Sequence, residues 1–391
     1  MTRLLVLAGK GGVGKSTVAA ATALLAAEQG GRVLLASIDS AHNLGDLFQQ
    51  PVGAVPVSVQ PGLDVLEVDA NRELTTNWSA VLDFVRQISA NDPGVSELVA
   101  EECAVLPGLE EVFGLLRLHE ILESESYDLV LLDAPPTGDL LKFLRLPEVL
   151  RWFMERCHPL DRTLTRRLRP VAEALHWPVP PDAALVEMDH WYHKVSAVGE
   201  WLMDPDRASA RLVLTPDRVA LSETRRAWAW TCLLGMNVDG IIVNRVLPDR
   251  ELPEWLTAWR ARQQEILSEA AHSFADLEVL QAELRAEEVL GVPALLAFGR
   301  ALYGERDPAA VWAAAPPLRW AETPHEATLS LRLPFLRRDQ FRLLTGRDGL
   351  TVVVGNQRRI VPLPASIHRR TLRGARYDAG WLHVSFGPRS E

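Results

Sequence analysis

The segment at residues 9–17, GKGGVGKST, has the glycines, lysines and hydroxyl side chains of a phosphate-binding loop at the required spacing. A short apolar run at residues 4–8 precedes it and a helix-like stretch at residues 18–29 follows it, which is the strand–loop–helix context of a P-loop. Glycines let the backbone approach phosphate, and successive N–H groups attract negative charge. The residues that we expect to contact a nucleotide are Gly9, Lys10, Gly11, Gly12, Val13, Gly14, Lys15, Ser16 and Thr17.

Two of these residues have the chemistry for catalysis or metal binding. Lys15 is expected to bridge the β- and γ-phosphates of ATP, and the Ser16 hydroxyl is expected to be a ligand of Mg2+. Lys10 lies inside the same loop, where a cation cannot easily fold back onto phosphates that Lys15 already serves. It is therefore either an exposed lysine without a role or a residue that acts outside its own loop. The xKGGxGK[ST] form is similar to that of the deviant Walker-A dimeric ATPases, which implies that Lys10 reaches the partner subunit's nucleotide.

Several apolar runs read as buried strands, and the residue that follows each run is a candidate for the site. These runs lie at residues 32–38, 127–132, 211–215 and 240–243, and they end at Asp39, Asp133, Pro216 and Asn244. In an open parallel sheet, ligands bind beyond the carboxyl ends of the strands, so these residues should gather near the P-loop. Asp133 is suited to hold Mg2+ through water, as a Walker-B aspartate does. Asp39, a further candidate for the metal site, is placed to orient or deprotonate the attacking water.

Length and charge set limits on the class of protein. The 391 residues suggest two or three domains, because about 150 residues per domain is usual. The net charge of -10 argues against general affinity for nucleic acid. The three cysteines are widely spaced and include no CxxC, which predicts reduced, buried thiols rather than a disulfide framework or a zinc site. No apolar run approaches the ~20 residues of a membrane-spanning helix, so we expect a cytoplasmic protein.

Four segments resemble the ArsA/GET-type ATPases over roughly residues 1–310. SIDSAHNLGDLF (residues 37–48) resembles their switch I, and DAPPTGDLLKFLRLP (133–147) resembles their switch II. TPDRVALSET (215–224) and IIVNRV (241–246) resemble their adenine-side segments. The resemblance implies that Asp39 activates water, Asn244 reads the adenine and Pro216 packs near it. It also implies a homodimer that opens and closes a hydrophobic groove for membrane-protein or other hydrophobic clients, with a possible membrane receptor.

Two positions depart from that family's pattern. Asp139 replaces the usual switch II histidine, so a contact that links nucleotide state to groove closure is expected to differ. Ser40 stands where proline is usual in switch I, which predicts a looser loop. Neither position is a phosphate ligand.

Helical periodicity interrupts the strand pattern at residues 71–126 and 148–210. Apolar stripes recur there at helical spacing, i, i+3, i+4 and i+7 in the first of them, and each stripe is either ordinary core or part of a client groove. The stripes are Trp78, Val81, Leu82 and Val85; Trp191, Val195, Val198 and Leu202; and the denser cluster Val149, Leu150, Trp152 and Phe153.

The C-terminal part has a different pattern. Residues 305–326 are rich in Ala and Pro and predict a linker, after which apolar residues alternate with period two. GLTVVVGNQRRIVPLPASI followed by DAGWLHVSF resembles the α-crystallin (small heat-shock protein) domain, without that family's C-terminal I-x-I anchor. Twelve arginines from residue 324 onward either form a solvated face or dock on the acidic remainder of the chain.

These patterns together predict an α/β P-loop NTPase fold with a mostly parallel sheet and helical client-groove insertions at residues 1–304. A small all-β sandwich follows at residues 327–391. The predicted activity is hydrolysis of ATP to ADP and phosphate by a homodimer that handles hydrophobic clients. One alternative is the energising subunit of an arsenite or antimonite efflux pump, which the missing cysteine triad disfavours. The other is a nucleotide-stabilised holdase-like module, which Asp39 and Lys10 disfavour because a structural nucleotide needs neither.

Overall fold

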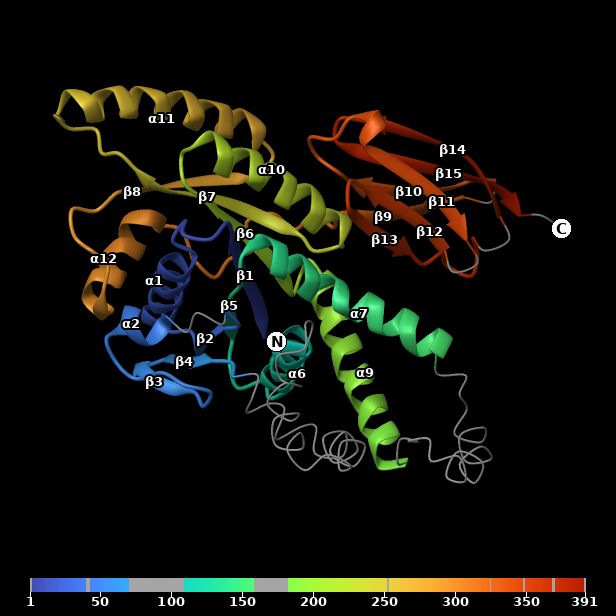
Figure 1. Cartoon of the computed structure of the whole chain (residues 1–391), viewed down its shortest axis with the longest axis horizontal. Coiled ribbons are helices and arrows are strands. Elements are labelled where there is room, and N and C mark those ends of the chain that lie inside the picture. Colours follow the sequence, from blue (N-terminus) through green and yellow to red (C-terminus); the bar gives the residue numbers. More distant parts are fainter. Residues whose placement is uncertain are drawn as a thin grey trace, which may run out of the picture.

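An eight-stranded sheet lies at the centre of the larger part of the molecule (Figure 1). The structure is a computed structural model, and it describes residues 2–39, 43–69, 109–157, 182–251, 253–323, 325–346, 349–367 and 370–389. The strand order is β3-β4-β2-β5-β1-β6-β7-β8, and only β3 and β4 pair antiparallel. The strands are β1 (Arg3–Gly9), β2 (Val33–Ser37), β3 (Val57–Gln60), β4 (Leu63–Glu67), β5 (Leu129–Asp133), β6 (Ala208–Leu214), β7 (Val238–Val246) and β8 (Glu278–Glu283).

Helices cover both faces of this sheet, which is why its central strands are almost continuously apolar. Helices α1, α2 and α12 pack on one face, and α6, α7, α9, α10 and α11 pack on the other. In the described part of the chain, no helix is both long and apolar enough to span a membrane. The helices are α1 (Lys15–Glu28), α2 (Leu44–Phe48), α6 (Leu109–Glu123), α7 (Thr137–Cys157), α9 (Asp182–Met203), α10 (Arg218–Leu233), α11 (Glu254–Ser273) and α12 (Gly291–Tyr303).

The C-terminal part is all-β and antiparallel, as predicted. One sheet has the order β14-β15-β10-β9 and the other β11-β12-β13, and their inner faces enclose a separate apolar core. We call residues 318–389 the β-domain. Its strands are β9 (Leu318–Glu322), β10 (Ala327–Arg332), β11 (Phe341–Gly346), β12 (Gly349–Val354), β13 (Gln357–Val361), β14 (Arg370–Asp378) and β15 (Trp381–Arg389). The mostly parallel α/β fold and the all-β region confirm the predicted fold class.

The segment expected to be a linker differs from that expectation. Strand β9 lies within residues 305–326 and pairs with β10 along its whole length. Because β9 is an edge strand with mostly exposed side chains, it lacks the alternation that identifies a half-buried strand. The β-sandwich therefore begins several residues before the position predicted from the sequence.

The apolar stripes divide between core and surface. Val195, Val198 and Leu202 of α9 are buried in the core beneath the sheet, so that stripe is packing. Val149 and Trp152 of α7 are 45% and 44% exposed, which leaves an apolar surface on that helix. The stripe at Trp78, Val81, Leu82 and Val85, and the side chain of Phe153, lie outside the described residues.

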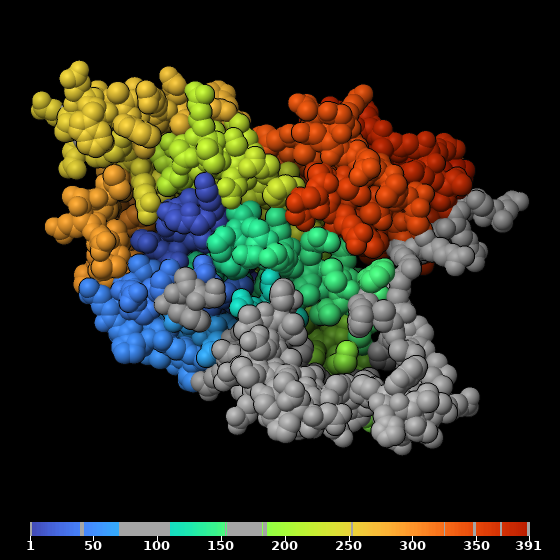
Figure 2. Space-filling model, viewed as in Figure 1, coloured from blue at the N-terminus to red at the C-terminus, as the bar shows by residue number. Residues whose placement is uncertain are grey.

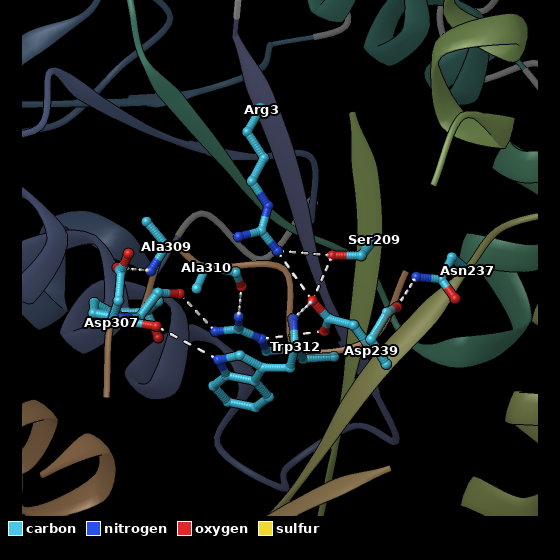
Figure 3. A network of polar contacts seen from close by, with 12 residues as sticks. Arg3, Ser209, Asn237, Asp239, Asp307, Ala309, Ala310 and Trp312 are labelled. Atoms are coloured by element: carbon cyan, nitrogen blue, oxygen red, sulfur yellow. Dashed lines mark hydrogen bonds and ion pairs between the residues drawn. The ribbon is translucent and has the colours of Figure 1, made fainter. Parts of the chain in front are cut away.

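A buried polar network joins the amino ends of three strands to residues 307–312 (Figure 3). Arg211 of β6 is fully buried and donates to Asp239 Oδ1 at 3.2 Å and to the carbonyl oxygens of Pro308 and Ala310 at 2.7 and 2.8 Å. Its guanidinium carbon lies 3.4 Å from the centre of the Trp312 ring. Arg3 of β1 also donates to Asp239, at 3.0 Å, and burial lowers the pKa of Arg3 to about 10. The start of the expected linker is thus fixed against the sheet.

We expect Arg211→Met to lower the free energy of unfolding by ~3–5 kcal/mol, because it removes one partner from a buried ion pair. The urea midpoint measures this effect. Arg32→Met breaks the exposed Arg32–Asp128 pair and is the matched control, with an expected midpoint close to wild type. A midpoint for Arg211→Met that equals the control's would show that the network does not stabilise the fold.

Candidate functional site

The loop between β1 and α1 runs very close to its neighbouring strands. Gly14 precedes α1 with φ +92°, and a Cβ there would lie 2.4 Å from Nδ2 of Asn244 on β7. A Cβ on Gly9 would lie 2.2 Å from the carbonyl oxygen of Val213 on β6. Only glycine fits at these two positions, so the loop backbone is held at the carboxyl ends of β6 and β7.

A cavity of about 410 Å3 opens in front of this loop. Lys15 is buried at its base, and Ser16, Thr17 and Asp39 line it with three loop glycines. The lining residues are Gly11, Gly12, Gly14, Lys15, Ser16, Thr17, Asp39, Asn43, Asp46, Leu47, Pro136, Arg245 and Leu290. The site has the positive end of α1, a buried cation and hydroxyl groups on one wall, which is the chemistry that binds a polyphosphate.

Asp133 lies at the end of β5, between the ends of β1 and β2. Its carboxylate is fully buried, and neither oxygen has a hydrogen-bond partner among the described residues. Burial raises the pKa of Asp133 to about 6, although the nearby Ser16 and Lys15 lower it in part. A buried carboxylate without a partner beside the Ser16 hydroxyl fits a divalent cation such as Mg2+, so the residues present suit that metal.

Asp39 lies two residues after the end of β2, and β2 pairs with the strand that ends in Asp133. Its backbone N–H donates to the Ser37 hydroxyl at 3.2 Å, which fixes the direction in which the chain leaves the strand. Residues 40–42 lie outside the described part. At the start of α2, the Leu44 N–H donates to the buried carboxylate of Glu67 at 2.8 Å. Sequence reasoning missed Glu67, although it ends an apolar run in the same way as Asp133.

Asn244 connects β7 to the P-loop. Its Nδ2 donates to the Val13 carbonyl at 2.9 Å and its Oδ1 accepts from Arg245 N–H at 2.9 Å. The side chain also lines a second cavity, of about 550 Å3, beside the loop. Pro216 is buried after β6 and lines neither of these cavities. The structure therefore brings Asn244 to the loop and does not bring Pro216 to the cavity walls.

Arg245 is a site residue that sequence reasoning missed. It is exposed, has φ +58°, and lines both cavities where they meet. A left-handed conformation at a residue other than glycine is uncommon and clusters at functional sites. Arg245 could have been predicted as a site residue from the sequence, because it directly follows Asn244 near the end of a strand. The remaining wall of the second cavity is the connection from β8 to α12, at residues 283–290.

Lys10 and Asp139, two further positions singled out in the sequence, line neither cavity. Lys10 is exposed. Asp139, in the first turn of α7, accepts from Lys142 Nζ at 2.6 Å on the surface.

Comparisons with known proteins match both parts of the chain. The family model described as "Anion-transporting ATPase" matches residues 2–304, and one described as "HSP20-like domain found in ArsA" matches residues 324–386. A protein of Chlorobaculum tepidum named "Putative arsenical pump-driving ATPase" is 33% identical over 98% of this chain and 96% of its own length. An Aquifex aeolicus protein named "Putative arsenical pump-driving ATPase 1" is 30% identical over 93% and 95%. An Entamoeba dispar protein named "ATPase ASNA1 homolog" is 30% identical over 75% of this chain and 91% of its own length.

Proposed function

Because the chain belongs to the ArsA family of anion-transporting ATPases, we propose that it is a homodimer that couples ATP hydrolysis to the opening and closing of a hydrophobic client groove. The observation that carries this proposal is the cavity where Lys15, Ser16 and Asp39 meet beside the unpartnered carboxylate of Asp133. A holdase with a purely structural nucleotide would need neither Asp39 nor Lys10. The clients would be membrane proteins or other hydrophobic chains, handled in the cytoplasm and passed to a membrane receptor.

The chemistry follows from the residues around the cavity. Lys15 and the loop N–H groups would bind the β- and γ-phosphates and stabilise the charge that develops on them. Ser16 and Asp133, with Asp39 nearby, would hold Mg2+, which supplies charge neutralisation on the phosphate oxygens. Asp39 would accept a hydrogen bond from the attacking water and orient it toward the γ-phosphate.

The homodimer is proposed for a physical reason. Lys10 is exposed and does not line the cavity beside its own loop, which supports a role at the phosphates of a second subunit. Closing two subunits face to face would place each Lys10 at the partner's site. The site would then be complete only in the dimer, which ties hydrolysis to groove closure.

The adenosine is expected to occupy the 550 Å3 cavity, where Arg245 would lie over the base. Arg245→Ala should raise the Kd for ATP about tenfold, the size of one favourable cation–π contact, with kcat little changed. The Kd for inorganic tripolyphosphate should stay constant, because that ligand has no base. Arg250→Ala, at an exposed arginine in the next loop, is the matched control. Equal losses for ATP and tripolyphosphate would show that Arg245 binds phosphate instead.

Exposed apolar side chains on α7 and α9, two helices on the same face of the sheet, support a client-binding surface. Val149 and Trp152 on α7 are exposed, and Val186, near the start of α9, is 39% exposed. Helix α7 starts next to the nucleotide cavity, so its position can depend on the nucleotide. We propose an ATPase domain at residues 1–304, which the range of the first family match supports. We propose that the β-domain begins at β9, because β9 pairs with β10, although the second family match starts after β9, at residue 324.

The names of two relatives favour a second candidate, the energising subunit of an arsenite or antimonite pump. The one cysteine whose side chain the structure describes does not suit that role. Cys232 is completely buried, and burial raises the pKa of its thiol to about 12, so it is neither accessible nor a thiolate. Cys103 lies outside the described residues.

One ATPase assay separates the two candidates. Arsenite should leave the wild-type rate within about twofold, because metalloid binding needs accessible thiolates. A fluorescent peptide with the sequence of a membrane-spanning helix should bind the Asp39→Asn protein about tenfold more tightly with ATP than with ADP, the coupling expected of linked sites. Activation by arsenite together with nucleotide-independent peptide binding would favour the pump subunit.

A further inference from the structure

The β-domain is anchored on α10 and on the α11–β8 connection. Arg332 of β10 donates to Asp276 Oδ2 at 2.9 Å, and its guanidinium carbon lies 4.8 Å from the Trp228 ring centre. Phe335 packs edge-on against Trp228 and Phe274 at ring distances of 5.6 and 6.0 Å. Figure 2 shows the β-domain seated against α7 and α10.

A buried ion pair belongs to the same anchor. Arg359 of β13 donates to the carbonyl oxygen of Leu233, the last residue of α10, at 2.8 Å. Glu148 of α7 supplies the counter-charge, and its carboxylate also accepts from the Ile360 N–H at 2.7 Å. Burial lowers the pKa of Arg359 to about 10, and the charge of Glu148 opposes this shift. The charged groups of the anchor therefore have their partners within the chain.

A cavity of about 430 Å3 lies beside this anchor, between α10 and the β-domain. Ala229 and Trp230 line it from α10, and Phe335, Leu336 and Val353 line it from the β-domain. It shares no lining residue with the two cavities beside the P-loop. A volume of this size with mostly apolar and aromatic walls is typical of pockets that bind small organic molecules.

Phe335 gives this cavity a strained wall. Its φ of +64° is a left-handed conformation that is a genuine outlier for a bulky side chain. The ring is 42% exposed although the residue is part of the anchor, and the Arg225 guanidinium carbon lies 5.5 Å from the ring centre. Strained backbone of this kind clusters at sites that hold ligands. An apolar ligand in the cavity would cover the exposed part of the ring.

Two arginines at the cavity carry charge that nothing in the described chain neutralises. Arg226 of α10 and Arg342 of β11 are exposed and have no hydrogen-bond or ion-pair partner among the described residues. The other charged lining residues are paired. Arg225 donates to a carboxylate of α11 at 2.8 Å, and Asp339 accepts from Arg337 at 3.2 Å. The uncompensated charge at the cavity is therefore positive, and each domain contributes one cation.

The secondary structure places each of these cations beside an apolar wall. Arg226, Ala229 and Trp230 are spaced i, i+3 and i+4 along α10, so they share one face of that helix. Arg342 is paired directly with Val353 across β11 and β12, so the two side chains lie on the same face of that sheet. The cavity thus combines an apolar interior with a cationic group on each side.

We propose that this cavity binds a small amphipathic carboxylate, with an apolar body of about ten carbon atoms against Trp230 and Phe335 and its head group at Arg226 and Arg342. Planar guanidinium groups match a carboxylate in shape and charge. A neutral apolar ligand would leave both cations unused, and a highly polar ligand would find few partners on these walls. A bound ligand would contact both α10 and the β-domain. The proposal does not depend on the proposed ATPase mechanism.

Calorimetry on the full-length wild type tests the ligand class. Decanoate should bind, and hexanoate should bind at least about tenfold more weakly, because each buried CH2 contributes about fourfold in affinity. Decyltrimethylammonium has the same chain with a cationic head and should also bind at least about tenfold more weakly than decanoate. No binding of decanoate, or equal Kd values for decanoate and decyltrimethylammonium, would overturn the proposal.

Paired substitutions test the two cations. The double variant Arg226→Gln/Arg342→Gln should raise the Kd for decanoate at least about tenfold, since hydrogen bonds to a charged group are lost. The matched control is Arg262→Gln/Arg373→Gln, which removes one exposed arginine from α11 and one from β14, both outside the cavity. It should keep the wild-type Kd. Equal losses in the two double variants would show that net charge, and not this cavity, attracts the anion.

Photolabelling locates the ligand. A decanoate with a diazirine near the end of its chain should label peptides that contain residues 225–230 or 334–355, and unlabelled decanoate should compete with it. Mass spectrometry of the digested protein identifies the labelled peptides. Labelling confined to the exposed apolar surface of α7, at Val149 and Trp152, would contradict the proposed site. Labelling that persists unchanged in Arg226→Gln/Arg342→Gln would contradict the role of the two arginines.

Discussion

Asp39→Asn is expected to lower kcat for ATP hydrolysis by about 10²–10⁴-fold, the usual effect of removing a catalytic carboxylate. Asparagine has nearly the same size but cannot draw a proton from water or orient it as strongly. ATP should still bind, because the phosphate contacts come from Lys15 and the loop rather than from Asp39. The purified variant should therefore retain ATP, which steady-state kinetics and analysis of the bound nucleotide measure directly.

Asp46→Asn is the matched control, because Asp46 lines the same cavity from the first turn of α2. It should retain wild-type kcat within a few-fold. Equal loss in both variants would indicate a general effect of cavity charge. Wild-type turnover in Asp39→Asn would remove Asp39 from the mechanism.

Lys10→Ala is expected to lower kcat by about 10²–10³-fold, as loss of one preorganised charge at a transition state does. The Kd for ATP in the isolated subunit should be close to wild type, since Lys10 lies outside its own cavity. The comparison variant is Lys142→Ala, which removes another exposed lysine, paired with Asp139 on α7. A raised Kd with unchanged kcat would mean that Lys10 contributes binding only.

The central strands were predictable because burial on both faces makes them continuously apolar. Strands β1, β2, β5, β6 and β7 all overlap the predicted runs, and the carboxyl ends of these parallel strands lie at the same edge of the sheet. Strands β3, β4 and β8 were not predicted. Strand β4 is mostly buried, but Asp64 interrupts its short apolar run. Strands β3 and β8 lie at the ends of the strand order and are only partly buried. Their apolar residues are too few to show a period.

In the β-domain, too, only strands with one buried face could be predicted from the sequence. Strands β10, β12 and β15 alternate clearly because one face of each packs into the core. Strand β14 has exposed or half-buried side chains along nearly its whole length, and its sequence therefore resembles a loop. A strand shows an alternating apolar pattern only where one of its faces is buried, and burial depends on its position in the sheet, which the sequence does not give.

At the candidate site, the local motif predicts a phosphate loop but says nothing of the loop's long-range contacts. The residues 9–17 were predicted from spacing alone, whereas the link from Asn244 to Val13 joins residues far apart in the chain. Arg245, with φ +58°, contacts the same side chain, because its N–H donates to Asn244 Oδ1. The contact between Glu148 and β13 likewise depends on how two domains pack.

Mixing Lys10→Ala subunits with Asp39→Asn subunits tests the proposed dimeric ATPase most directly. If Lys10 acts across the interface, a mixed dimer holds one complete site, with the Asp39 of one subunit and the Lys10 of the other. Random exchange should give mixed dimers in about half of the population, so activity should recover to about a quarter of wild type per subunit, given twofold symmetry. Native mass spectrometry would verify the exchange. Activity that never exceeds that of either parent, despite proven exchange, would contradict the account.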